Sequence, residues 1–109
     1  MNSVEKLREA LSTANAVALF FKDVVDDGTS NFDHPMLLKP EGMSNSQVEE
    51  AFKVAHINCE RVKTGMWKNF YHIYGVSLGQ GSRRTTMAEK FAEALKQAGY
   101  TATVFYQID

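Results

Sequence analysis

The stretch KNFYHIYGVSLGQGSRRTTMAEKFAEALKQAGYTATVFYQI (residues 68–108) decides the fold, because its hydrophobic period changes twice. Alternation over Lys68–Leu78 predicts a β-strand, one face of which carries Phe70, His72, Tyr74, Val76 and Leu78. The next segment predicts a helix over Arg83–Ala98, with buried positions at helical spacing at Met87, Phe91, Leu95 and Ala98. Gly99 is a suitable C-terminal cap, and alternation returns to predict a strand over Thr101–Ile108.

Upstream, the sequence predicts a second strand, helix and strand. The nearly continuous apolar run within Ala16–Val25 indicates a central strand. Residues 26–44 hold both prolines and indicate an irregular connection, either a functional loop or a plain surface loop. The segment Ser44–Gln47 fits a capping box that starts a helix reaching about Ala55. The next strand is expected over Cys59–Thr64.

A leading helix over Val4–Ala14, capped by Ser3, precedes these elements. The order after it is βαββαβ, which indicates an α+β, ferredoxin-like two-layer sandwich with an extra N-terminal helix, in a single domain over 1–109. Both crossover helices should cover one face of the sheet. The other face stays open unless the leading helix or residues 26–44 cover it.

The composition is that of an ordinary soluble domain, with 44% hydrophobic and 23% charged residues and a net charge of −1. Residues 1–60 carry −5 and residues 61–109 carry +4, which suggests a basic patch if the fold separates the two halves. A single cysteine excludes an internal disulfide. The start of the chain has no signal-peptide pattern, and no apolar run is long enough for a bilayer, so we expect a cytoplasmic protein with no membrane contact.

The turn before the last helix is a candidate anion site. Gly79 and Gly81 let backbone N–H groups converge at a helix N-terminus, where Ser82, Arg83 and Arg84 add donors and positive charge. The arginines are expected to contact phosphate. The alternative is a tight turn with two solvated arginines.

Basic and aromatic residues interleave across the hairpin before this turn. Lys63 and Lys68 would attract phosphates, and Trp67, Phe70 and His72 would stack on bases, as in single-stranded nucleic-acid binding. The alternative is that these rings pack beneath the leading helix or the segment 26–44.

At these positions the chain resembles the RNA-recognition motif family. Lys68, Phe70 and His72 stand where that family has a basic residue and two aromatic residues on its third strand. Leu19–Phe21 resembles the companion motif, with Phe20 in the outward place. Asn69 and Tyr71 replace the glycines of the motif, and Gly75 stands where the family has an aromatic residue. The resemblance implies nucleic-acid binding on the sheet.

Two weaker groups complete the candidates. Oxygen ligands for a hard cation occur at Asp23, Asp26, Asp27 and Asp33, next to His34, although solvated charge is the default there. Cys59 with His56 is a weak candidate for a nucleophile and its base. We therefore expect no catalytic residues, no metal and no cofactor.

The sequence favours a non-enzymatic binding protein whose partner is most simply a nucleic acid held by its phosphates. Two alternatives stay open: a small protein-binding inhibitor or adaptor of mobile-element type, docking through its acidic half, and a small enzyme for an anionic substrate. A homodimer through the open sheet face is also possible.

Overall fold

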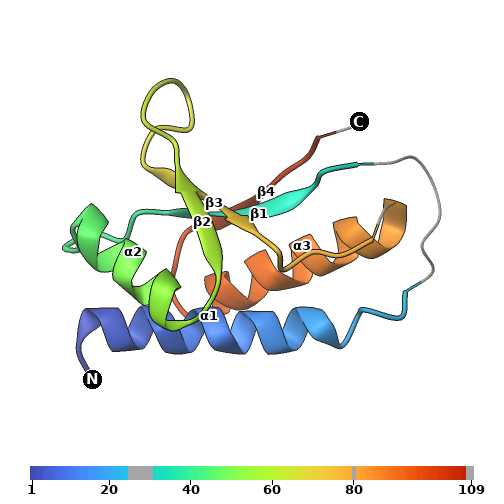
Figure 1. Cartoon of the computed structure of the whole chain (residues 1–109), viewed down its shortest axis with the longest axis horizontal. Helices are drawn as coiled ribbons and strands as arrows, with labels where there is room; N and C mark the ends of the chain where they lie inside the picture. Colours follow the sequence, from blue (N-terminus) through green and yellow to red (C-terminus); the bar gives the residue numbers. More distant parts are fainter. Residues whose placement is uncertain (25–30, 80, 108–109) are drawn as a thin grey trace.

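The computed structural model describes residues 1–24, 31–79 and 81–107 (Figure 1). Its elements in chain order are α1 Ser3–Leu19, β1 His34–Leu38, α2 Asn45–Val54, β2 Asn58–Arg61, β3 Phe70–Tyr74, α3 Gly81–Gln97 and β4 Ala102–Phe105. The strands form an antiparallel sheet in the order β2-β3-β1-β4. The predicted α+β class with a leading helix is confirmed.

The first helix is longer than predicted, and the strand predicted over Ala16–Val25 is wrong. Helix α1 continues to Leu19, and its N-cap is Asn2 rather than Ser3. Its inward positions are fully buried and keep helical spacing to the end, at Leu7, Leu11, Ala14 and Ala18. Burial of this stripe against α2 and α3 favours the helix over the strand-like apolar run at its end. Residue 25 lies outside the described residues.

The first strand lies inside the segment predicted to be irregular. Pro35 argued against a strand there, because proline cannot donate to a sheet ladder. Leu38 N–H donates to the Thr101 carbonyl beside β4, whereas Lys39 N–H donates to the Asn69 carbonyl beside β3. By alternation the nitrogen of Pro35 therefore faces β3. The ladder between β1 and β3 starts one residue later, at Met36, so the missing N–H breaks no bond.

The remaining elements lie where the sequence placed them, with different ends. The capping box of Ser44 and Gln47 is present at the start of α2. β2, β3 and β4 are shorter than predicted, and α3 begins earlier, at Gly81. Gly75, at φ +79°, ends the alternation of β3 and turns Val76 into the core, whereas the sequence put Val76 on the face of His72. Ala98 was predicted to be buried and is exposed, and Ile108 lies outside the described residues.

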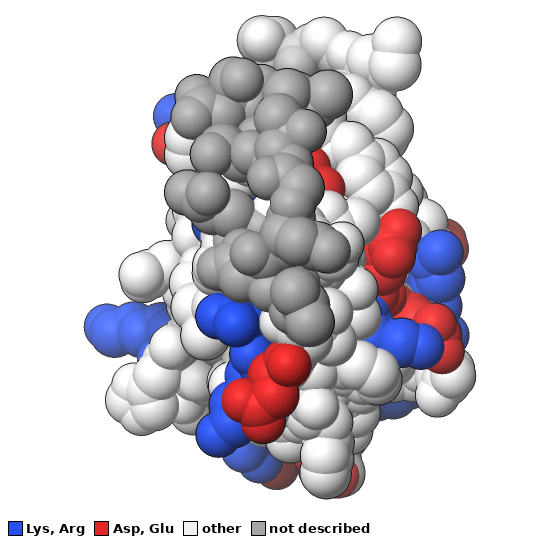
Figure 2. Space-filling view, turned by 90° about the vertical axis from the view of Figure 1, so that its right-hand side faces the viewer, with Lys and Arg blue, Asp and Glu red and all other residues white. Residues whose placement is uncertain are grey.

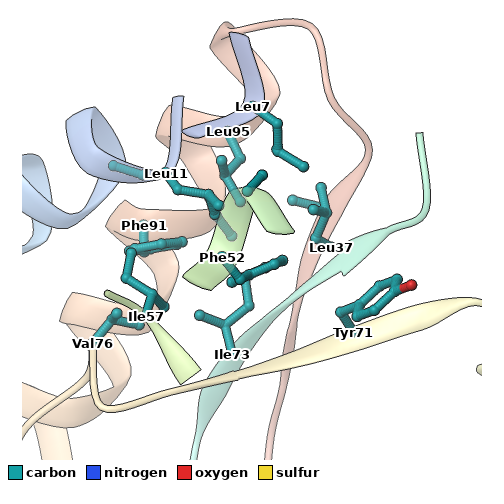
Figure 3. Close-up of a cluster of buried hydrophobic side chains, with 14 of the residues drawn as sticks. Leu7, Leu11, Leu37, Phe52, Ile57, Tyr71, Ile73, Val76, Phe91 and Leu95 are labelled. Carbon is teal, nitrogen blue, oxygen red and sulfur yellow. The ribbon is translucent and has the colours of Figure 1, made fainter. Parts of the chain in front are cut away.

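The core lies between the sheet and the helices. Figure 3 shows side chains from α1, α2 and α3 converging on the inward residues of the strands. Strand side chains alternate between the two faces, and the ones that point into the core are Leu37, Tyr71, Ile73 and Ala102. They lie on the face opposite the predicted ring-bearing face. Helix α1 packs against both α2 and α3. All three helices therefore lie on one side of the sheet, and α1 does not cover the other side (Figure 1).

Asp33, the residue before β1, joins several elements through its backbone and its buried carboxylate. Thr85 Oγ1 of α3 donates to Oδ2 at 2.7 Å, and the Gln107 N–H after β4 donates to Oδ1 at 2.8 Å. Its backbone carbonyl accepts from Ser77 Oγ and from Arg84 Nε, each at 2.9 Å. Asp33 is only 5% exposed, so the loss of these bonds would leave buried polar atoms without partners.

We predict that Asp33→Asn lowers the free energy of unfolding by about 2 kcal/mol, because an amide cannot accept at both of its positions. Chemical denaturation followed by circular dichroism measures this change. Asp23→Asn is the matched control, since Asp23 is exposed and the same change there should cost less than about 0.5 kcal/mol. Equal stability of the two variants would contradict the prediction.

Candidate functional site: the open sheet face

The face of the sheet turned away from the helices carries rings at both of its ends. We call it the open face and define it by the outward residues of the four strands: His34, Met36, Leu38, Asn58, Glu60, Phe70, His72, Tyr74, Thr103 and Phe105. The strands bring these residues together from both halves of the chain. The predicted sharing of one face by Phe70, His72 and Tyr74 holds along β3.

Four of the rings form a cluster at one end of the open face. The His34 ring lies 4.8 Å from that of His72, 5.0 Å from that of Tyr74 and 5.4 Å from that of Phe105, centroid to centroid. His34 is buried beneath its neighbours, whereas Tyr74 is 37% exposed and His72 and Phe105 are half-buried. The cluster therefore offers ring surface to water around a buried imidazole.

The two histidines form a hydrogen-bonded chain with a fixed direction. His34 Nδ1 lies 2.8 Å from the Phe32 carbonyl oxygen, and His34 Nε2 lies 2.6 Å from His72 Nδ1. A carbonyl oxygen only accepts, so Nδ1 of His34 carries a hydrogen and its Nε2 is an acceptor while the ring is neutral. His72 Nδ1 must then donate, and Nε2 of His72 is left without a hydrogen when both rings are neutral.

Burial lowers the pKa of both histidines below the ordinary value of 6.5. For His34, the bond to the Phe32 carbonyl opposes this decrease, while the neighbouring His72 and Arg84 lower the pKa further. For His72, the charge of Glu60 opposes the effect of burial. The pair is therefore mainly neutral near neutral pH.

The other end of the open face is bounded by the connection between β2 and β3, which rises beyond the sheet away from the helices (Figure 1). Trp67 is 38% exposed and packs edge-on against Phe70, with the ring centroids 5.3 Å apart. Lys63 and Lys68 are exposed in the same connection. Of the predicted rings, Trp67 and Phe70 therefore lie at this end with the two lysines, whereas His72 belongs to the cluster at the other end.

The predicted anion turn makes internal contacts. Gly79 and Gly81 both have positive φ, and the Gly81 carbonyl accepts from the Asn31 side chain. Arg83 Nε donates to the Val24 carbonyl, and Arg84 Nε donates to that of Asp33. These bonds explain why two arginines are tolerated at a helix N-terminus. Ser82 is exposed, and residue 80 lies outside the described residues.

The structure places the arginines and the lysines at opposite ends of the sheet. Arg84 contacts the residue before His34, whereas Lys63 and Lys68 lie near Phe70, which pairs with Leu38 at the far end of β1. On the face shown in Figure 2, Lys and Arg are interspersed with Asp and Glu. This face therefore carries both signs of charge rather than a purely basic patch.

The structure also bears on three further candidates: the companion motif of the resemblance, the Cys59 nucleophile and the acidic metal site. Leu19–Phe21 lies at the end of α1, not on a strand, and Phe20 is 85% exposed away from the sheet, so the companion motif of the resemblance is absent. Burial raises the pKa of Cys59 to about 11, which keeps its thiol protonated. Among the described residues no group of three or more His, Cys, Asp or Glu could hold a metal ion, and Asp26 and Asp27 lie outside them.

Sequence reasoning did not identify His34 or Phe105 as members of the site. The sequence groups His34 with the acidic residues of its segment and does not single out Phe105 within the predicted strand Thr101–Ile108. The alternation of Thr101–Ile108 was the available signal for Phe105. His34 could not be found in this way, because its strand was not predicted.

No protein-family model matches the chain, and neither the search of curated proteins nor that of solved structures found a match. In the described part of the chain, no helix has the length and apolar character needed to cross a bilayer.

We predict that the protein becomes less stable as the pH falls below 6.5. The unfolded chain binds protons at the ordinary histidine pKa, while folding holds the pKa of His34 and His72 lower, so acid favours unfolding. Urea denaturation at about pH 7.5 and pH 5.5 measures the loss.

A double variant, His34→Gln with His72→Gln, should lose less stability over this interval. His56→Gln is the control, since His56 lies in the turn after α2, away from the open face. An unchanged pH dependence in the double variant would show that other groups control acid stability.

Proposed function

We propose that the protein is a non-enzymatic binding module for single-stranded nucleic acid, with the open face as the binding surface. The observation that carries the proposal is that Phe70, His72, Tyr74 and Phe105 are all outward residues on the side of the sheet that none of the described helices covers. The His72 ring contacts those of Tyr74 and Phe105. Rings on such a surface stack on bases of any sequence.

We also propose that the fold is a ferredoxin-like variant. The antiparallel order β2-β3-β1-β4 supports this, because the two strand–helix–strand units interleave in one sheet. Helix α1 is an addition that packs between the two crossover helices. The fold itself implies no function.

The positive charge that would hold phosphates lies at both ends of the rings. Lys63 and Lys68 are exposed beside Trp67 and Phe70, and the charge of Arg84 reaches His34 at the other end. The guanidinium group of Arg84 also lies 5.9 Å from the Phe32 ring. A strand laid along β3 would pass from the lysines over Phe70 and His72 towards the arginine end.

Stacking is tested with a single-stranded oligonucleotide, using the chain's one tryptophan as a probe. We expect binding to quench Trp67 fluorescence, and Phe70→Ala to weaken binding about tenfold, because one stacking platform is lost. Phe20→Ala is the control, since this exposed ring lies at the end of α1. Absence of binding at low salt, or equal effects of the two variants, would overturn the proposal.

The charge contribution is tested by a second pair of variants. Lys63→Ala with Lys68→Ala should reduce the salt dependence of binding by about two phosphate contacts. Lys22→Ala with Lys53→Ala makes the same charge change on exposed positions outside the open face. If both double variants lower the salt slope equally, the hairpin lysines do not contact phosphate. Capture of a protein or self-association by light scattering, without nucleic-acid binding, would favour the adaptor or homodimer alternatives.

Glu60 is an acidic residue on the open face and should oppose a phosphate backbone. Its carboxylate accepts from the Tyr74 hydroxyl at 3.3 Å, and its strand position is opposite His72. We predict that Glu60→Gln strengthens binding about threefold at about pH 7.5 and low salt, because a like charge near the phosphates is removed. Glu49→Gln, on α2, is the control. Weaker binding of Glu60→Gln would contradict the proposed path of the strand.

A further inference from the structure

The outer nitrogen of His72 is the unused end of the histidine chain. His72 Nδ1 is engaged with His34 at 2.6 Å, while Nε2 makes no hydrogen bond within the described residues. In the same part of the chain, no buried side-chain nitrogen or oxygen lacks a partner. Nε2 of His72 therefore reaches water and is available to a ligand on the open face.

We infer that the His34–His72 pair takes up a single proton, displayed at Nε2 of His72, and that this proton couples binding of a phosphodiester to pH. The inference rests on the proposed function, because the ligand is the nucleic-acid backbone on the open face. It adds the group that makes the contact and the condition under which it does so.

The hydrogen-bond chain limits the pair to one proton. When His72 is protonated, its Nδ1 still donates to His34 Nε2, and His34 Nδ1 still donates to the Phe32 carbonyl. Every existing bond is kept, and only Nε2 of His72 gains a hydrogen. A second proton would put hydrogens on both nitrogens of the 2.6 Å contact and would break it.

The surrounding charges put the proton on His72 rather than on His34. Glu60 of β2 favours a charged His72. Arg84 of α3 disfavours a charged His34, against a smaller favourable effect of Asp33. Tyr74 of β3 donates to Glu60, and Phe105 of β4 contributes only its ring. The partly exposed imidazole next to a carboxylate is thus the one that ionises first.

Protonation changes Nε2 of His72 from a hydrogen-bond acceptor into a charged donor, and this changes its interaction with a phosphate from repulsive to attractive. In the neutral pair, Nε2 of His72 is a lone-pair acceptor and repels an anionic oxygen. In the protonated pair it is a charged donor, which makes a strong hydrogen bond to such an oxygen. Bound phosphate must then raise the pKa of His72. Affinity therefore increases as the pH falls, and binding is accompanied by the uptake of at most one proton.

The experiment measures binding of a single-stranded oligodeoxythymidylate of about ten nucleotides, a length suited to one small domain. Calorimetry at about pH 6 in two buffers of different ionisation enthalpy counts the protons taken up, which should be above zero and not exceed one. Affinity should increase by up to about tenfold between pH 7.5 and pH 5.5 if the bound state raises the pKa by one unit, because tenfold is the limit reached below both pKa values.

His72→Gln should lose this proton uptake and most of the pH dependence, whereas His56→Gln should keep both. Nitrogen-15 NMR of the imidazoles in the free protein at about pH 8 provides a readout independent of any ligand. It should show the hydrogen on Nδ1 in both His34 and His72. A hydrogen on Nε2 of neutral His72, or two protons taken up by the folded pair, would overturn the inference.

The failures of the two proposals are distinguishable. Binding with equal affinity at both pH values, or with the same pH dependence in His72→Gln, overturns the proton coupling and leaves the proposed function standing. No binding at either pH overturns the proposed function together with the coupling.

Discussion

The carboxylate of Asp33 fixes the geometry on which both the fold and the open face depend. It is buried at the point where β1 begins, and its two oxygens accept from α3 and from the segment after β4. A buried carboxylate is costly unless such donors surround it. The elements that supply them are distant in sequence, so the bonds form only when the sheet and α3 are assembled in the correct register.

This junction also orients the histidine chain. Asp33 stands between Phe32, whose carbonyl accepts from His34, and His34 itself. The Asp33 carbonyl holds Arg84, the cation whose charge acts on His34. The same short segment therefore anchors the fold on the helix side and sets the tautomer of the imidazole on the open face. The contacts that anchor the fold and those that orient the imidazole therefore come from three consecutive residues, Phe32, Asp33 and His34.

Local signals predicted several parts of the molecule well. The capping box at Ser44 and Gln47 is determined by bonds within one turn, so it forms as read. The alternation of β3 placed Phe70, His72 and Tyr74 on one face, because side chains of a strand alternate wherever it lies. That alternation failed at Val76, where the positive φ of Gly75 reverses the side on which the next residue lies.

The errors have a common cause in long-range packing. The apolar run at residues 16–21 suits a strand or a buried helix, and periodicity cannot separate the two over so few residues. Contacts with α2 and α3 decide for the helix as far as Leu19. Likewise, Pro35 alone disfavours a strand, because proline has no N–H to donate. The pairing of β1 with β3 begins one residue later, at Met36, so the strand is compatible with the proline.

By itself, the sequence determined the α+β class, the leading helix, the start of α2 and the ring-bearing face of β3, since each depends on neighbours a few residues apart. The tertiary structure alone decided that β1 lies at the centre of the sheet and that α1 leaves the open face uncovered. It also brought His34 to His72, 38 positions apart. That contact depends on strand register, which burial of the helix-covered face of the sheet sets and no local pattern encodes.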